Sequence, residues 1–170
     1  FHTLVDPIAT YCYQPMPKQP FIKIVPGKPD RFLAIAPTIR AIDESFEVKY
    51  KAEDKWGNPS DQCDCQLTLR SSNQIAGLPD KVILSPGQFS GTISGLTVRE
   101  AGDLYIEFFD DTGALVCCTN PIRIEDMPES RHFWGDLHGQ SEETIGTGTA
   151  EAYFKFARDL AFVDITGHQG

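Results

Sequence analysis

The chain has no long apolar run, and no stretch approaches the roughly 18 consecutive apolar residues that a membrane-spanning helix needs. It is also poor in basic residues, with 15 Lys and Arg against 24 Asp and Glu and a formal net charge of -9. Because binding to phosphates needs clustered Lys and Arg, this balance argues against a non-specific nucleic-acid binder. We therefore expect a soluble globular protein whose partners are neither membranes nor nucleic acids.

Signals for export are also missing from the first residues. Residue 1 is Phe, and Phe1–Ile8 has neither the basic start nor the long apolar core of a signal peptide. We expect the native N-terminus to lie upstream, together with any targeting information.

The five cysteines are an odd set, so they cannot all pair within one chain. Cys63-Asp64-Cys65 and Cys117-Cys118 could be two halves of a thiolate metal site, but both lack the two-residue spacer common in tetrahedral sites. We favour small buried residues with free thiols. Free thiols in turn favour a reducing compartment such as the cytoplasm over an oxidising one.

Residues 21–126 predict short β-strands at intervals of roughly ten residues, the spacing typical of an immunoglobulin-like β-sandwich. The predicted strands are Phe21–Val25, Arg31–Ala36, Ser45–Ala52, Cys65–Leu69, Lys81–Leu84, Gly91–Leu96, Asp103–Phe109 and Leu115–Ile124. Turn residues such as those of Trp56-Gly57-Asn58-Pro59 separate them. No helical period competes in this region.

Alternation of apolar and polar residues predicts which strand faces are buried. Phe46, Val48 and Tyr50 alternate with Glu47, Lys49 and Lys51, so we expect the first set in the core and the second in water. The predicted core residues are Ile24, Phe32, Ile35, Phe46, Val48, Tyr50, Leu67, Leu69, Val82, Leu84, Ile93, Leu96, Leu104, Ile106 and Phe108. Acidic pairs near strand ends, such as Glu53-Asp54, are expected to organise turns.

Residues 1–20 contain four prolines and several aromatic residues. Proline disfavours regular elements, so we expect an extended N-terminal arm that lies on another surface, with disorder in solution as the alternative.

Residues 127–170 show a different pattern, in which a strand, a polar loop, a helix and a second strand follow one another. We predict a strand over His132–Leu137, a loop over Gly139–Gly148 and a helix that begins at Ala150 with Thr149 as its cap. The apolar face of this helix consists of Ala150, Tyr153, Phe154, Ala157, Leu160 and Ala161. A second strand over Phe162–Thr166 completes a βαβ unit, which should be right-handed with parallel strands.

The two strands of this unit are each followed by a histidine, His138 and His168. Because the carboxyl ends of parallel strands meet at one edge, both imidazoles should lie on the edge where α/β enzymes carry their chemistry. Neutral imidazole binds Zn, Mn or Fe, and Asp136 lies where it could bind the metal or orient a ligand. A closed α/β barrel needs on the order of 200 to 250 residues, so we expect this segment to be an incomplete part of one.

The residues from Trp134 to His138, the following Gly-Gln-Ser, the Ala150–Arg158 helix and the closing Thr-Gly-His resemble a family of unknown function related to the polymerase and histidinol phosphatase (PHP) superfamily. Members of this family often carry an N-terminal immunoglobulin-like domain. The resemblance implies a distorted TIM-like barrel in which a cluster of two or three metal ions hydrolyses phosphoesters or similar substrates.

The same resemblance suggests metal ligands and shows two departures. The first motif of the superfamily is His-x-His, which here corresponds to His138 and Gln140, and its second motif ends in Asp-His or Glu-His, which here is Gly167-His168. The resemblance makes His138, His168, Gln140 and Glu142 the candidate metal ligands, with Glu143 as a neighbour of Glu142. Asp136 is the candidate catalytic residue.

These observations favour the N-terminal portion of a metal-dependent hydrolase acting on a small-molecule substrate, completed by a second chain or a further segment. The alternative is a related barrel whose altered ligands make it a lyase or a non-catalytic binding protein. In that case the sandwich would serve as a module for assembly with partners or with further copies of the chain.

Overall fold

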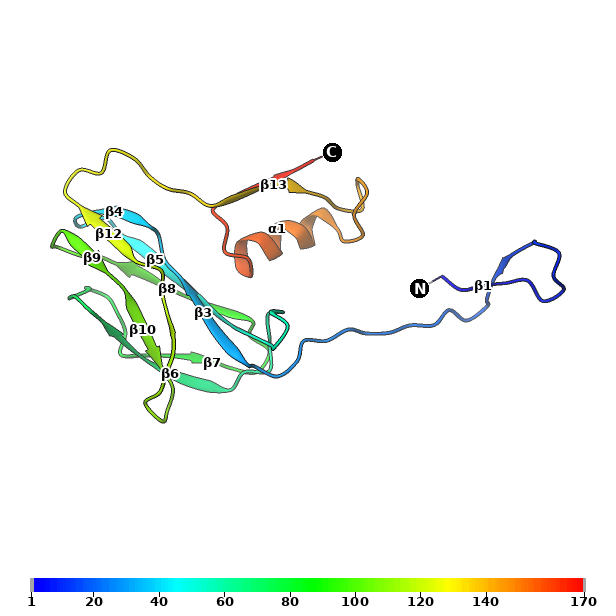
Figure 1. Ribbon diagram of the computed structural model, residues 1–170, viewed down its shortest axis with the longest axis horizontal. Helices are drawn as coiled ribbons and strands as arrows, with labels where there is room; N and C mark the ends of the chain where they lie inside the picture. Colours follow the sequence, from blue (N-terminus) through cyan, green and yellow to red (C-terminus); the bar gives the residue numbers. More distant parts are fainter. Residues whose placement is uncertain (1, 170) are drawn as a thin grey trace.

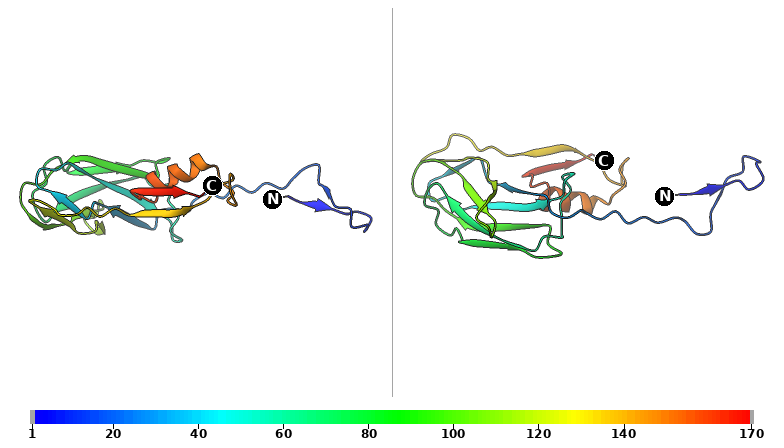
Figure 2. Two further views of the ribbon diagram at one scale, coloured as in Figure 1. Left: turned by 90° about the horizontal axis from the view of Figure 1, so that it is seen from above. Right: turned by 60° about the horizontal axis from the view of Figure 1, so that its bottom comes forward.

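The computed structural model describes residues 2–169, and the outermost residues of the predicted arm and barrel segment, Phe1 and Gly170, lie outside it. Figure 1 shows three parts: an N-terminal arm, a β-sandwich and a small strand-helix-strand unit beside the sandwich. Figure 2 shows from two further directions that the arm projects away from the other two parts. Among the described residues, no helix is long and apolar enough to span a membrane.

The sandwich is built from ten strands in three sheets. One sheet has the order β3-β5-β8, the second β11-β10-β6-β7 and the third β4-β12-β9. The strands are β3 (Arg31–Ile35), β4 (Ile39–Ala41), β5 (Phe46–Glu53), β6 (Cys65–Ser71), β7 (Lys81–Leu84), β8 (Ser90–Leu96), β9 (Gly102–Leu104), β10 (Ile106–Phe109), β11 (Leu115–Cys118) and β12 (Ile122–Glu125). All pairs are antiparallel except β4 with β12, which is parallel.

The core lies between these sheets and follows the predicted alternation. Phe46, Val48 and Tyr50 are buried on one face of β5, and Leu104, Ile106 and Phe108 are buried further along the chain. The rings of Tyr50 on β5 and Phe108 on β10 meet between the β3-β5-β8 and β11-β10-β6-β7 sheets, with centroids 5.8 Å apart. The predicted β-sandwich is therefore present.

Several strand predictions need correction. The segment Phe21–Val25 pairs with no other strand within residues 2–169, because it belongs to the arm rather than to the sandwich. The single strands predicted over Asp103–Phe109 and Leu115–Ile124 are each two strands, because the chain changes sheet between β9 and β10 and between β11 and β12. β4 was not predicted.

The prediction of burial in the core is also wrong for two residues. Ile24 lies in the arm and is 92% exposed. Ile35 faces outward from β3, because Phe32, Ala34 and Ala36 take the inward positions of its two-residue period. The outer face of β3 is therefore apolar at Ile35, which bears on the site below.

The N-terminal arm is longer than predicted. It contains a small hairpin in which β1 (Leu4–Val5) pairs antiparallel with β2 (Gln14–Pro15). An extended segment then runs to β3 and first bonds to the sandwich at Pro26, whose carbonyl accepts a hydrogen bond from Gln62 Nε2 at 2.5 Å. The next bond is at Gly27, whose backbone N–H donates to Asp54 Oδ2 at 3.0 Å. The hairpin and the first part of the extended segment project away from the sandwich (Figure 2).

Asp54 organises the turn after β5. Its carboxylate accepts hydrogen bonds from the backbone N–H groups of Gly27, Trp56 and Asn58 and from the Asn58 side chain. Burial alone would raise the pKa of Asp54, but these hydrogen bonds outweigh it and lower the pKa from 3.8 to about 2. Asp54 thus organises the turn, as predicted, whereas Glu53 is buried and pairs with Arg31 and Lys51 instead.

We expect Asp54→Asn to destabilise the protein at neutral pH. A carboxylate with a lowered folded pKa contributes stability above its unfolded pKa, and this contribution is lost as the pH falls through the folded value. The stability difference between wild type and variant should therefore shrink as the pH falls from 3.8 towards about 2. Urea unfolding at several pH values measures this difference.

The control is Asp111→Asn, which replaces an exposed aspartate of another turn. The free energy of unfolding of this variant should remain close to that of the wild type throughout the same pH range. A difference between wild type and Asp54→Asn that stayed constant with pH would contradict the role assigned to the Asp54 charge.

Candidate functional site

The strand-helix-strand unit consists of β13 (Gly135–Gly139), α1 (Ala150–Asp159) and β14 (Ile165–His168). β13 and β14 pair in parallel, as predicted, with Gly135 opposite Ile165 and Gly139 opposite His168. The strands begin three residues later than predicted, at Gly135 and Ile165. His138 and His168 consequently lie within the last two residues of their strands, at the same edge of the sheet.

Local sequence explains where α1 begins. Thr149 caps the helix, and its hydroxyl accepts a hydrogen bond from Ala152 N at 3.1 Å. The predicted apolar face is only partly covered: Ala157 is buried and Tyr153 half-buried, but Phe154 is exposed. This helix face is therefore less enclosed than that of a helix on a complete sheet.

Tyr153 connects the helix to both strands. Its hydroxyl is hydrogen-bonded to Thr166 Oγ1 and donates to Gly167 O at 3.3 Å. Its ring covers Gly139, where a Cβ atom would overlap the ring. Only glycine leaves room for Tyr153 at this point of β13.

The loop after β13 is organised by Ser141, which is fully buried. The Ser141 carbonyl accepts hydrogen bonds from Thr144 N and Gly146 N, each at 2.9 Å. Its hydroxyl accepts one from Glu143 N at 3.2 Å and lies 2.8 Å from His168 Nε2. The loop thus holds a serine hydroxyl against the ring of His168.

The ring of His168 is enclosed on other sides by aromatic side chains. The centroids of Tyr153 and Phe154 each lie 6.1 Å from that of His168. The imidazole therefore has a defined orientation, with Nε2 directed at Ser141.

The other predicted site residues lie nearby but make fewer contacts. His138 and Asp136 are exposed, and Asp136 Oδ1 accepts a hydrogen bond from His138 N at 2.9 Å. This bond lies where the register between β13 and β14 is irregular. Gln140 is half-buried beside Ser141, and Glu142 is exposed with its backbone N–H donating to Gly148 O at 2.7 Å.

No group of three or more His, Cys, Asp or Glu side chains that could hold a metal ion occurs within residues 2–169. The structure thus brings His138 and His168 to one edge without assembling a complete ligand set from the described part of the chain. The same finding applies to the four cysteines considered as a thiolate site.

Ser141 was not among the site residues predicted from the sequence. The available signal was its position at the start of Ser141-Glu142-Glu143-Thr144, since serine and threonine side chains commonly bond to backbone N–H groups in tight turns. That signal predicts a turn, but the partner on the remote strand, His168, is not visible in the local sequence.

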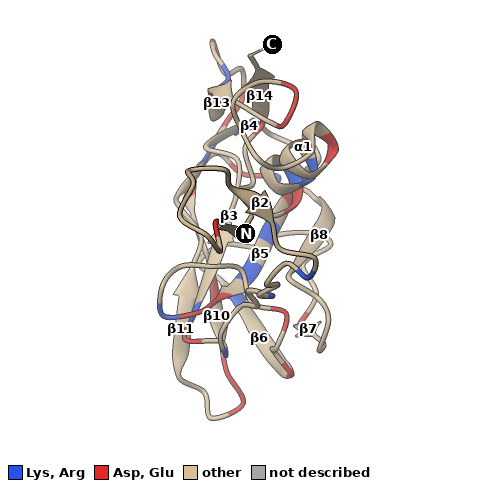
Figure 3. Cartoon of the chain, turned by 90° about the vertical axis from the view of Figure 1, so that its right-hand side faces the viewer, with Lys and Arg blue, Asp and Glu red and all other residues tan. Residues whose placement is uncertain are grey.

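The unit is docked on the outer face of the β3-β5-β8 sheet. Lys51 Nζ donates to Leu160 O at the end of α1 at 2.7 Å, and it forms an ion pair with Glu53 Oε1 at 2.8 Å. Lys51 also lies over the Phe162 ring, 5.4 Å from its centroid. Figure 3 shows the basic colouring of β5 below α1. The prediction of a solvated outer face is wrong at Lys51, which is 6% exposed, because α1 covers it.

Glu53 is the buried partner of two cations. Burial by itself raises the pKa of Glu53, but hydrogen bonds from Lys51 and Arg31 outweigh it, so the pKa is lowered overall. The Arg31–Glu53 contact is 2.6 Å. This network fixes the C-terminal end of α1 at one place on the sandwich.

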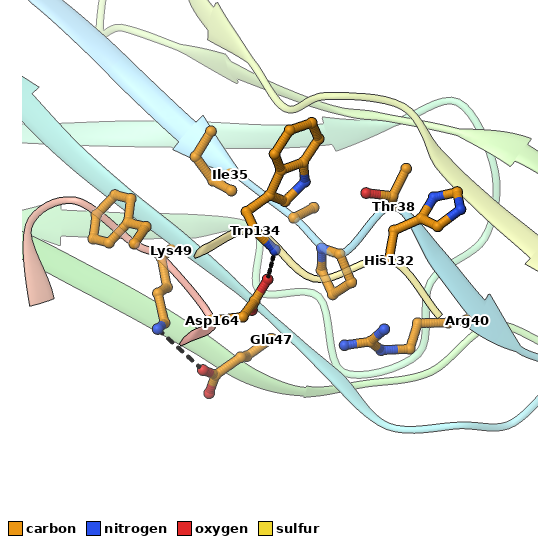
Figure 4. Close-up of a pocket in the computed structure, with 11 residues that line it drawn as sticks. Ile35, Thr38, Arg40, Glu47, Lys49, His132, Trp134 and Asp164 are labelled. Atoms are coloured by element: carbon orange, nitrogen blue, oxygen red, sulfur yellow. Dashed lines mark hydrogen bonds and ion pairs between the residues drawn. The ribbon is translucent and has the colours of Figure 1, made fainter. Parts of the chain in front are cut away.

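A cavity of about 110 Å³ lies in this interface. Figure 4 shows Ile35 and Lys49 of the sandwich facing Trp134 and Asp164 of the unit, with Asp164 accepting a hydrogen bond from Trp134 N at 2.8 Å. Trp134 thus lines the interface with the sandwich, and the residues around this cavity include none of the predicted metal ligands.

Comparison with models of known protein families finds no match for this chain, and comparison with curated proteins finds none either.

Proposed function

We propose that residues 127–170 form the first part of a PHP-like, metal-dependent hydrolase domain and that the sandwich is an immunoglobulin-like domain that carries it. The observation that supports this most strongly is the parallel pairing of β13 and β14, which brings His138 and His168 to one sheet edge. In parallel α/β proteins, this edge is where catalytic and ligand-binding groups occur.

Exposed apolar residues support a larger domain. Leu137 on β13 is 70% exposed, Ile165 on β14 is 52% exposed and Ile145 in the loop is 84% exposed. Parallel sheets normally have both faces covered, so a parallel pair with such exposed residues favours further strands and helices. We infer that a second chain or a further segment supplies them and closes a distorted TIM-like barrel.

The donor chemistry fits part of a metal site. Imidazole, carboxylate and amide groups are available from His138, His168, Asp136, Gln140 and Glu142, and these donors suit Zn, Mn or Fe. Since the described residues contain no group of three or more candidate ligands, the remaining ligands would come from the rest of the barrel. A bound divalent metal would supply a water of lowered pKa and polarise a phosphoester oxygen.

The residues of this chain would position the ligands. Ser141 and the rings of Tyr153 and Phe154 hold the imidazole of His168, and Asp136 fixes the backbone conformation at His138 through the bond to His138 N. Preorganisation of this kind is what a ligand needs before the metal arrives. Asp136 also retains a second carboxylate oxygen that could accept a proton or bind a metal.

Metal content and hydrolysis of the complete protein test the proposal. We expect the wild type to retain Zn, Mn or Fe after exhaustive dialysis and to hydrolyse a chromogenic phosphoester. In His138→Ala, metal content and turnover should each fall by more than about tenfold, because even the loss of a group that only supports a ligand costs 10- to 100-fold.

The matched control is His2→Ala, since His2 is an exposed histidine in the arm, remote in sequence from the strand-helix-strand unit. It should retain the metal content and turnover of the wild type. If His138→Ala also retained both, the assignment of His138 as a ligand would be refuted.

A second candidate is a related barrel with altered chemistry, either a lyase or a non-catalytic binding protein in which the sandwich mediates assembly. The observation in its favour is that His168 Nε2 already has a partner in Ser141. A complete protein that holds no metal, and whose thermal stability does not change when divalent metals are added, would favour the non-catalytic form.

A further inference from the structure

Two cysteine side chains lie in contact at the start of β6. The Sγ atoms of Cys63 and Cys65 are 3.0 Å apart. A disulfide bond is about 2.05 Å long, so the two sulfurs need to approach by only about 1 Å to form one. Asp64 lies between them and is exposed, which means that both thiols point to the inner side of the chain.

The two thiols differ in their surroundings. Cys63 is 3% exposed and belongs to the core, whereas Cys65 is half-buried. Burial, followed by the neighbouring Cys65 thiol and the Asp64 charge, raises the pKa of Cys63 to about 12. An external reagent therefore reaches Cys65 first, and Cys63 can react only with a group already attached to its neighbour.

The backbone at this point is held less tightly than in the middle of the sheet. β7 pairs with β6 from Cys65 to Thr68, but β10 pairs with it only from Thr68 to Ser71. Cys65 thus has a strand partner on one side only. A small shift of the chain at Cys63 and Cys65 would not break the central part of either ladder.

We propose that Cys63 and Cys65 form a reversible redox site that low-molecular-weight disulfides oxidise. The Cys65 thiolate attacks one sulfur of the oxidant, whose S–S bond breaks and releases one thiolate. Cys63 then loses its proton to solvent and attacks the Cys65 sulfur, which displaces the second thiolate. The protein loses two electrons and two protons, and the oxidant is reduced to two thiols.

The test is incubation of this chain with oxidised glutathione, followed by acid quenching, alkylation of the remaining thiols and peptide mapping. In the wild type we expect a peptide in which Cys63 and Cys65 are linked, with the loss of two hydrogen atoms. Reduced dithiothreitol should reverse the change. Glutathione bound to the exposed Cys12 and Cys118 would map to other peptides.

Two variants separate the steps. Cys63→Ser should stop at a persistent glutathione adduct on Cys65, because the resolving thiol is absent. Cys65→Ser changes the less buried position and should leave Cys63 unmodified in the folded protein. Cys118→Ser is the control and should form the Cys63–Cys65 link like the wild type.

A wild-type protein that carries glutathione on Cys65 without forming the link would overturn the proposal. So would a protein in which only Cys12 and Cys118 react. Formation of the link at the same rate after unfolding in urea would also overturn it, because the folded arrangement would then contribute nothing.

Discussion

Replacing Lys51 by methionine is expected to lower the free energy of unfolding by about 3 kcal/mol. Lys51 is buried, and its loss leaves the Leu160 carbonyl without its donor and Glu53 without one of its two cations. Removing one partner of a buried ion pair typically costs 3–5 kcal/mol, and we expect the lower end because Glu53 keeps Arg31. Urea unfolding measures the total effect.

Hydrogen exchange shows where the Lys51→Met effect is located. Amide protons of α1 should exchange faster in the variant, while those of β10 in the opposite sheet should change much less. The matched control is Lys49→Met on the same face of β5. Lys49 Nζ reaches Arg158 O at only 3.4 Å and is more exposed, so its replacement should cost about 0 to 1 kcal/mol.

Equal effects of the two substitutions would contradict the docking role of Lys51. A large effect confined to the sandwich, with α1 exchange unchanged, would contradict it as well. In either case the contact between Lys51 and the end of α1 would not stabilise the docking of the strand-helix-strand unit on the sandwich.

Gly139→Ala is expected to destabilise the strand-helix-strand unit by about 1 to 3 kcal/mol, the usual cost of overfilling a packed site. The new methyl group would overlap the Tyr153 ring. Tyr153 would have to move away, which breaks its bonds to Thr166 and Gly167 and removes one wall from His168. Thermal unfolding and hydrogen exchange at β14 measure the effect.

The matched control is Gly148→Ala in the loop between β13 and α1, where a Cβ atom would meet nothing within 4 Å. Its stability should remain close to that of the wild type. The double variant Gly139→Ala/Tyr153→Ala should be more stable than the sum of its single changes predicts, because the second change relieves the overlap. Simple additivity of the two changes would show that Gly139 and Tyr153 are not coupled.

Much of the fold was predictable because strand faces depend on neighbouring residues. Phe46, Val48 and Tyr50 alternate with polar residues, and this pattern alone places them in the core. The start of α1 was equally predictable, since Thr149 carries a capping hydroxyl directly before an apolar helix face.

The errors have two physical causes. β-propensity predicts that a segment such as Phe21–Val25 prefers an extended backbone, but it contains no information about whether a partner strand is present. Ile35 was assigned to the core because it is apolar, although the two-residue period directs it to the outer face of β3. That face is apolar because Trp134 and Phe162 come close to it in the interface.

For the candidate site, residue order was enough to predict that His138 and His168 end two parallel strands, because a helix between two strands constrains their direction. The partners of these residues depended on the folded chain. Ser141 meets His168 across 27 positions of sequence, and Lys51 meets Leu160 across 109. Contacts between such distant positions depend on packing of whole elements, which local periodicity and capping do not encode.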